Sequence, residues 1–134
     1  MSGKGLPHID AYDLPVTSEL PAGRVAWKPE RQRCALLIHD MQRYFVRPFS
    51  ADASPIAPAI ANISGIRRRC VSLGIPVFYT AQKGGQERRD RGLQADFWGP
   101  GMSATPEHQD IVAELAPEAG DIVLEKWRYS AFQR

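Results

Sequence analysis

Short apolar runs and one long amphipathic stretch alternate along the chain. Residues 34–38 (CALLI) form an unbroken apolar run, and residues 75–80 (IPVFYT) are rich in β-branched and aromatic side chains. Runs of this length and composition are typical of strands. The first is expected to be buried on both faces, as strands of parallel sheets are. Residues 121–125 (DIVLE) predict a third strand.

The stretch between the first two strands has the periodicity of an amphipathic helix. Apolar residues recur there at spacings of three and four: Ile56, Ile60, Ile63, Ile66, Cys70 and Leu73. Ser54 and Pro55 would supply the cap and the first helical residue, and Gly74 would end the helix. A strand, a helix and a strand in this order predict a βαβ unit with parallel strands, and therefore an α/β fold.

A second helix is predicted to start at Thr105 and Pro106 and to bury Ile111, Val112 and Leu115. This helix would precede the third strand. It would complete a second βαβ unit on the same sheet.

Two other segments lack a regular pattern. Residues 1–30 contain prolines at intervals of six to eight, which excludes a long helix and predicts an extended arm over the domain. Residues 83–101 are long, polar and glycine-bearing, as segments that close over binding sites often are.

Composition narrows the class of protein. A chain of 134 residues predicts one domain, and its net charge of +2 is too small to indicate a nucleic-acid partner. The sequence has no membrane-spanning apolar run and no signal-peptide core, so a cytoplasmic protein is expected. Cys34 and Cys70 are expected to be buried as small apolar residues. Because no cysteine or histidine has metal-site spacing, no metal or other cofactor is expected.

Polar side chains follow the predicted strands. Asp40, Gln82 and Lys126 each stand at a carboxyl end, where open α/β sheets bind ligands. With Arg91 from the long polar segment, they offer one acid or base, one amide and two cations, which suits proton transfer on a small anionic substrate. Simpler roles stay open. Asp40 could cap a helix, Lys126 could lie on the surface, and His39 could be a hydrogen-bonded core residue.

Four segments together resemble the isochorismatase family. They are LLIHDMQRYF (36–45), YTAQ (79–82), RGLQADFWGPGM (91–102) and KWRYSAF (126–132), and residues 1–30 resemble the family's opening. The resemblance covers nearly the whole chain. It implies a Rossmann-like isochorismatase fold, in which a parallel sheet has flanking helices. Only the first three strands of that sheet are expected here, with the C-terminal half of the family domain missing.

The resemblance also implies a reaction. Family enzymes hydrolyse the vinyl ether of isochorismate to pyruvate and 2,3-dihydro-2,3-dihydroxybenzoate, without metal or cofactor, in siderophore or phenazine biosynthesis. By resemblance the catalytic residues are Asp40, as general acid, and Lys126. The residues that hold the substrate are Gln82, Arg91, Phe45, Trp98 and Tyr129. A homodimer is also implied.

Three alternatives stay open. The substrate could be 2-amino-2-deoxyisochorismate, which a close branch of the family uses. The chain could belong to a Cys-dependent amide hydrolase of the same superfamily, whose reactive cysteine lies on a later strand, a place that neither Cys34 nor Cys70 occupies. It could also be an inactive fragment or an interaction module.

Overall fold

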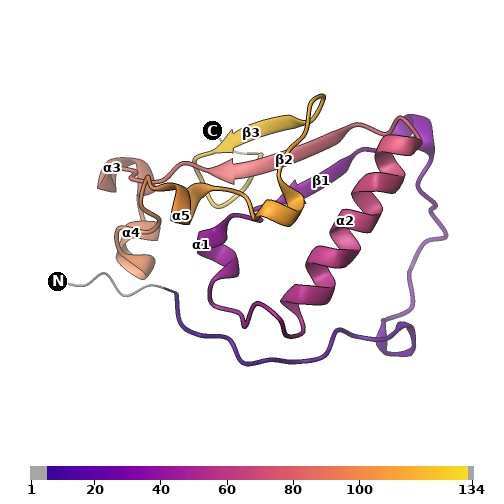
Figure 1. Cartoon of the computed structure of the whole chain (residues 1–134), viewed down its shortest axis with the longest axis horizontal. Helices are drawn as coiled ribbons and strands as arrows, with labels where there is room; N and C mark the ends of the chain where they lie inside the picture. Colours follow the sequence, from indigo (N-terminus) through magenta and orange to yellow (C-terminus); the bar gives the residue numbers. More distant parts are fainter. Residues whose placement is uncertain (1–5, 133–134) are drawn as a thin grey trace.

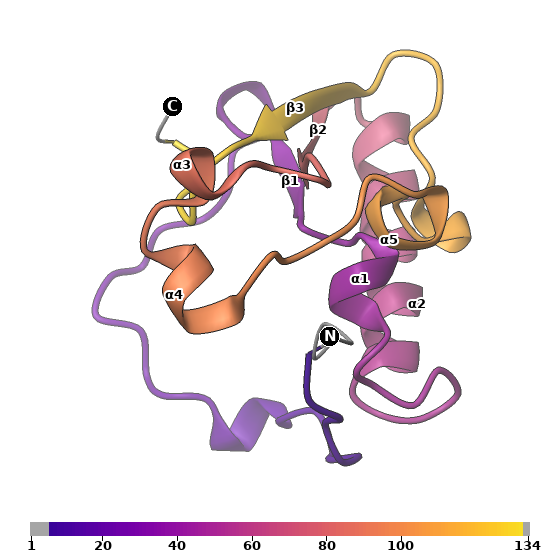
Figure 2. The ribbon, with the colours of Figure 1, turned by 90° about the vertical axis from the view of Figure 1, so that its left-hand side faces the viewer.

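A three-stranded parallel sheet lies against one long helix in the computed structural model, which describes residues 6–132 (Figures 1 and 2). The strands are β1 (Leu36–His39), β2 (Val77–Gln82) and β3 (Ile122–Lys126), in the order β1-β2-β3. Both neighbouring pairs are parallel. The predicted α/β fold with a parallel sheet is therefore confirmed.

Helix α2 (Ile56–Ser72) is the crossover between β1 and β2, and it packs along one face of the sheet (Figure 1). The predicted stop at Gly74 is confirmed, since this glycine has a φ of +67°, a conformation that favours a residue without Cβ. The predicted start was wrong. The hydroxyl of Ser54 donates to the backbone oxygen of Tyr12 (2.6 Å) instead of capping the helix, which begins at Ile56.

The predicted start of the second helix at Thr105 and Pro106 is confirmed, but its predicted length was wrong. Helix α5 (Pro106–Gln109) is a single turn, and a 3-10 turn (Ala113–Leu115) follows after an extended stretch. The stretch is extended because its backbone pairs with the segment after β1: Arg43 N–H donates to Asp110 O (2.8 Å), and Val112 N–H donates to Met41 O (3.0 Å). Tertiary pairing thus overrides the local helical preference.

Three further helices are short: α1 (Arg43–Val46), α3 (Arg88–Arg91) and α4 (Gln94–Trp98). With α5 they gather at the end of the sheet to which the strand arrows point (Figures 1 and 2). The long polar segment 83–101 supplies α3 and α4, so this part of the chain lies beside the carboxyl ends of the strands.

The hydrophobic core lies on the α2 face of the sheet. Its buried members are Ile38, Val77, Tyr79, Val112 and Leu115. On the opposite face the strand residues Leu37, Ile122 and Leu124 are exposed. The prediction that the first strand is buried on both faces was therefore wrong for the part of the chain that the structure describes.

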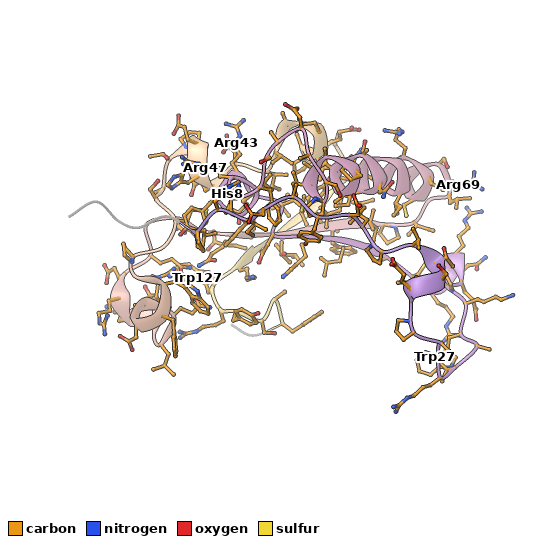
Figure 3. All side chains as sticks on the ribbon, turned by 90° about the horizontal axis from the view of Figure 1, so that it is seen from below. His8, Trp27, Arg43, Arg47, Arg69 and Trp127 are labelled. Carbon is orange, nitrogen blue, oxygen red and sulfur yellow. The ribbon has the colours of Figure 1, made fainter. Side chains whose placement is uncertain are left out.

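Before β1 the described chain is extended, apart from the 3-10 turns Thr17–Glu19 and Arg31–Arg33. Two backbone hydrogen bonds attach it to the body, from Ile9 N to Pro48 O (2.9 Å) and from Tyr12 N to Ser54 O (3.2 Å). Figure 3 shows Trp27 projecting from this segment, away from the sheet.

Two findings bear on the class of protein. Cys34 and Cys70 are free and partly buried, and Cys70 packs against the core, so the expectation of two buried cysteines holds only in part. Within residues 6–132, no helix has both the length and the apolar character that crossing a bilayer requires.

Candidate active site

The carboxyl ends of the three strands carry the predicted acid, amide and ammonium. Lys126 is the register partner of Gln82, and the Asp40 N–H donates to Thr80 O (3.2 Å) just beyond the end of β1. The Lys126 ammonium donates a hydrogen bond to Oδ2 of Asp40. The sheet therefore brings these three residues to one edge, and it joins two of them in an ion pair.

The backbone of Asp40 adopts an unusual conformation. Its φ is +53°, and it is the only non-glycine residue with a positive φ among residues 6–132. Thr80 is the register partner of His39, and Gln82 that of Lys126, so these four side chains share one face of the sheet. An extended residue 40 would point to the other face. The left-handed turn breaks that alternation, at a strain of about 1–3 kcal/mol that is typical of functional sites.

The carboxylate of Asp40 contacts three side chains. Besides Lys126, it accepts from the Thr80 hydroxyl (Oγ1 to Oδ1, 3.4 Å) and lies 3.4 Å from Nε2 of His39. Nδ1 of His39 lies 2.7 Å from the same hydroxyl. The Lys126 side chain is 6% exposed and that of Asp40 19%, so the pair is shielded from water while its carboxylate stays partly accessible.

A pocket of about 140 Å³ opens beside this pair. All five predicted substrate-holding residues line it: Phe45, Gln82, Arg91, Trp98 and Tyr129. Asp40 and Lys126 are not among its lining residues. Gln82 links the two groups, because it lines the pocket and pairs with Lys126 in the sheet.

Sequence reasoning missed other residues of the pocket wall: Leu6, Tyr44, Gln94, Gly101 and Met102. Gly101 has a definite physical role. Its φ is +73°, and a Cβ at this position would collide with the buried guanidinium of Arg91. The Nε of Arg91 donates to Gly99 O (3.0 Å), so both glycines help to seat the cation. The segment GPG at 99–101 was the available signal.

Gln42 was also missed, although it connects the site. Its side chain is almost fully buried, with 1% of the residue exposed. Its amide oxygen accepts from Gln82 N–H (2.6 Å), and its amide nitrogen donates to Gln82 O (2.8 Å) and Gln109 O (2.6 Å). Gln42 thus attaches the end of β2 to the segment that follows Asp40. In the sequence, only its position two residues after Asp40, within the segment LLIHDMQRYF, pointed to this role.

A second carboxylate–cation pair lies at the opposite end of β3. The Arg67 guanidinium of α2 donates to Asp121 (2.5 Å) and to Glu118 (2.9 Å), and Glu118 N–H also donates to Asp121 (2.8 Å). Burial raises the pKa of the Asp121 carboxyl, but these hydrogen bonds outweigh burial and the pKa is lowered overall. The hydrogen bond to Asp121 raises the pKa of the Arg67 guanidinium, against the effect of burial.

Tyr79 lies next to this second pair. Burial raises the pKa of its phenol, although the charge of Arg67 opposes the rise. Neither Tyr79 nor any residue of the second pair lines the pocket described above. Across residues 6–132 there is no group of three His, Cys, Asp or Glu side chains that could hold a metal ion.

Comparisons with known proteins match most of the chain to one family. Residues 34–134 match the isochorismatase domain. An isochorismatase of Bacillus subtilis (strain 168) is 53% identical over 129 residues, covering 96% of this chain and 41% of that protein. The phenazine biosynthesis protein PhzD1 of Pseudomonas aeruginosa is 49% identical, covering 96% of this chain and 61% of that protein. The chain thus spans about half the length of these relatives.

Among solved structures, a cysteine hydrolase from Pseudomonas syringae pv. phaseolicola superimposes with a TM-score of 0.70. The alignment covers 84% of this chain and 55% of that one, at 21% identity. At this identity the likeness concerns the fold alone. The domain match and the two relatives cover most of the chain, and on these grounds the chain belongs to the isochorismatase family.

Proposed function

We propose that the protein hydrolyses the vinyl ether of isochorismate, releasing pyruvate and 2,3-dihydro-2,3-dihydroxybenzoate. The observation that carries the proposal is the hydrogen-bonded pair of Asp40 and Lys126 at the carboxyl edge of the sheet. Gln82 connects this pair to the pocket. The 53% identity to an isochorismatase supports the choice of substrate.

Cleavage of a vinyl ether begins with protonation of its terminal carbon. Asp40 gives its proton to the methylene carbon, which becomes a methyl group, and the ether carbon becomes an oxocarbenium ion. Water adds to that carbon and releases a proton to solvent, and the Asp40 carboxylate takes up a proton before the next cycle. The resulting hemiketal collapses to pyruvate and the ring alcohol as a proton passes to the ring oxygen. The cycle consumes one water molecule and needs no protein nucleophile.

The cations have a separate part in this proposal. The substrate carries carboxylates, and the buried guanidinium of Arg91 lines the pocket in which one of them would bind. Lys126 would move toward the anionic substrate and release Asp40 from the ion pair, so that the carboxyl group can hold a proton. Phe45, Trp98 and Tyr129 would form apolar walls for the ring.

The second candidate substrate is 2-amino-2-deoxyisochorismate, which contains the same vinyl ether. The 49% identity to a phenazine biosynthesis protein favours it. Both substrates give pyruvate, so one assay tests both. The proposal also includes a location in the cytoplasm and, as the family resemblance implies, a homodimer, which sedimentation equilibrium tests directly.

The experiment is to incubate the protein with each substrate and to follow pyruvate with lactate dehydrogenase and NADH. Pyruvate should form from at least one substrate and not from chorismate, in which the ring hydroxyl and the ring double bonds occupy different positions. A variant of an exposed carboxylate, Asp52→Asn, serves as the matched control and should keep full activity. Absence of pyruvate with both substrates contradicts the proposal.

A further inference from the structure

His39 forms a closed cluster with the proposed acid. Its imidazole reaches Thr80 through Nδ1 (2.7 Å) and Asp40 through Nε2 (3.4 Å), and the Thr80 hydroxyl reaches Asp40 in turn (3.4 Å). The His39 side chain is 48% exposed, whereas the Lys126 side chain that pairs with Asp40 is 6% exposed. Among the side chains contacting Asp40, the imidazole thus combines access to water with ring nitrogens that can accept or donate a proton.

In the proposed reaction, Asp40 needs a group that can supply it with protons. The charged groups around His39 and Asp40 are the carboxylate itself, on the segment after β1, and the Lys126 ammonium, on β3. Thr80, from β2, is uncharged. Asp40 must carry a proton before it can protonate the substrate, and it gives that proton up in each turnover. Substrate in the pocket would restrict direct access of water from that side.

We propose that His39 delivers this proton to Asp40 during turnover, an inference that rests on the proposed function. His39 acts through Asp40 and does not touch the substrate, so it is a positioning and proton-transfer residue. The imidazolium gives its Nε2 proton to Oδ2 of Asp40, which leaves a neutral imidazole and a neutral carboxyl group. The imidazole then takes a proton from solvent. No oxidant or further reactant is needed.

Thr80 holds the cluster in the geometry that this transfer requires. A protonated imidazole donates from Nδ1 to the Thr80 hydroxyl, whose own hydrogen then points to Oδ1 of Asp40. After the transfer the neutral imidazole keeps its proton on Nδ1, so it still donates to the Thr80 hydroxyl. The hydroxyl therefore keeps a partner in both protonation states of His39.

The other described histidines differ from His39. His108 contacts Arg47 (2.8 Å) and Ser103 (2.8 Å), away from the ion pair. His8 lies 3.6 Å from Asp10 in the exposed segment before β1. His8 is a matched control, because it too is an exposed imidazole beside a carboxylate but is not part of the proposed site.

The test is the pH profile of pyruvate release for His39→Gln, from pH 5.5 to 9. We expect kcat to fall about ten- to hundredfold at pH 8, with KM within about twofold and a smaller loss at pH 5.5, where hydronium is more abundant as an alternative proton donor. Added imidazole should restore part of the rate, and His8→Gln should match the unmodified protein. A His39→Gln profile that superimposes on that of the unmodified protein overturns the inference.

A second measurement needs no turnover. The ¹³C signal of the Asp40 carboxyl group should follow protonation of the His39 ring, and this step should vanish in His39→Asn but persist in His8→Gln. An Asp40 signal that does not follow the imidazole overturns the inference. An unmodified protein that releases no pyruvate contradicts the proposed function instead, so the two failures are distinguishable.

Discussion

The two ends of β3 each lie beside a shielded carboxylate–cation pair, and the two pairs differ in their surroundings. At the amino end, Asp121 receives two hydrogen bonds from Arg67 and the Glu118 backbone, far from the pocket. At the carboxyl end, Asp40 contacts Lys126 and a half-exposed imidazole, beside the pocket. One carboxylate–cation pair therefore attaches a helix to the sheet, and the other has the surroundings that the proposed proton transfer needs.

The difference comes from how the carboxylate is held. Hydrogen bonds from the Arg67 guanidinium and the Glu118 backbone N–H stabilise the ionised form of Asp121. This suits a permanent link between α2 and the turn before β3. Asp40 stands on a strained backbone, and its partners include a group that can exchange protons. Access to a titratable partner and to a pocket separates the proposed catalytic pair from the structural one.

The largest expected effect is on turnover. Asp40→Asn keeps the size of the side chain but removes the acid, so kcat should fall by about 10³-fold or more, while substrate affinity changes by less than about threefold. Steady-state pyruvate release and equilibrium dialysis measure the two quantities. Near-normal turnover in Asp40→Asn would contradict the proposed catalytic role of the Asp40–Lys126 pair.

The structural pair should affect stability instead. Arg67→Met leaves the Asp121 carboxylate shielded without its cation, and breaking such a pair reduces the free energy of unfolding by about 3–5 kcal/mol. Urea unfolding measures the loss. Arg69, which Figure 3 shows at the far end of α2, is the control, and Arg69→Met should change stability by less than about 0.5 kcal/mol. Equal losses in both variants would contradict the structural role.

A substitution at Gln42 would test how the proposed site at the carboxyl ends of the strands is assembled. Gln42→Leu leaves the N–H and C=O of Gln82 without their buried partner, which should cost about 1–3 kcal/mol for each group left unpaired. Because Gln82 lines the pocket, KM should rise more than kcat falls. The exposed Gln32→Leu is the control. A variant with lost stability but an unchanged KM would limit Gln42 to a structural role.

The smallest expected effect is on how the free energy of unfolding depends on pH. Since the pKa of Asp121 is lowered in the folded state, its contribution to stability is fully present above the unfolded value of about 3.9 and is lost as pH falls through the folded value. Asp121→Asn should therefore flatten the decline in unfolding free energy below pH 4. The exposed Asp13→Asn should leave that decline unchanged. A decline that is equally steep in Asp121→Asn would contradict this contribution.

Much of the fold followed from local patterns. Apolar runs predicted the three parallel strands, and the β-α-β order predicted that Asp40, Gln82 and Lys126 would lie at one edge. The helix start at Ser54 and the extent of the second helix beyond Gln109 could not be predicted correctly. Both depend on backbone and side-chain partners distant in sequence, Tyr12 for Ser54 and Met41 for Val112.

By itself the sequence determined which chemical groups reach the edge of the sheet, because the side-chain period of a strand and the direction of parallel strands are local properties. Only the tertiary structure decided how those groups meet. The left-handed turn at Asp40, the contact with His39 and the buried amide of Gln42 arise from packing between segments about 40 residues apart. Such contacts leave no periodic pattern in the chain, and they distinguish the proposed proton-transfer site from an ordinary ion pair.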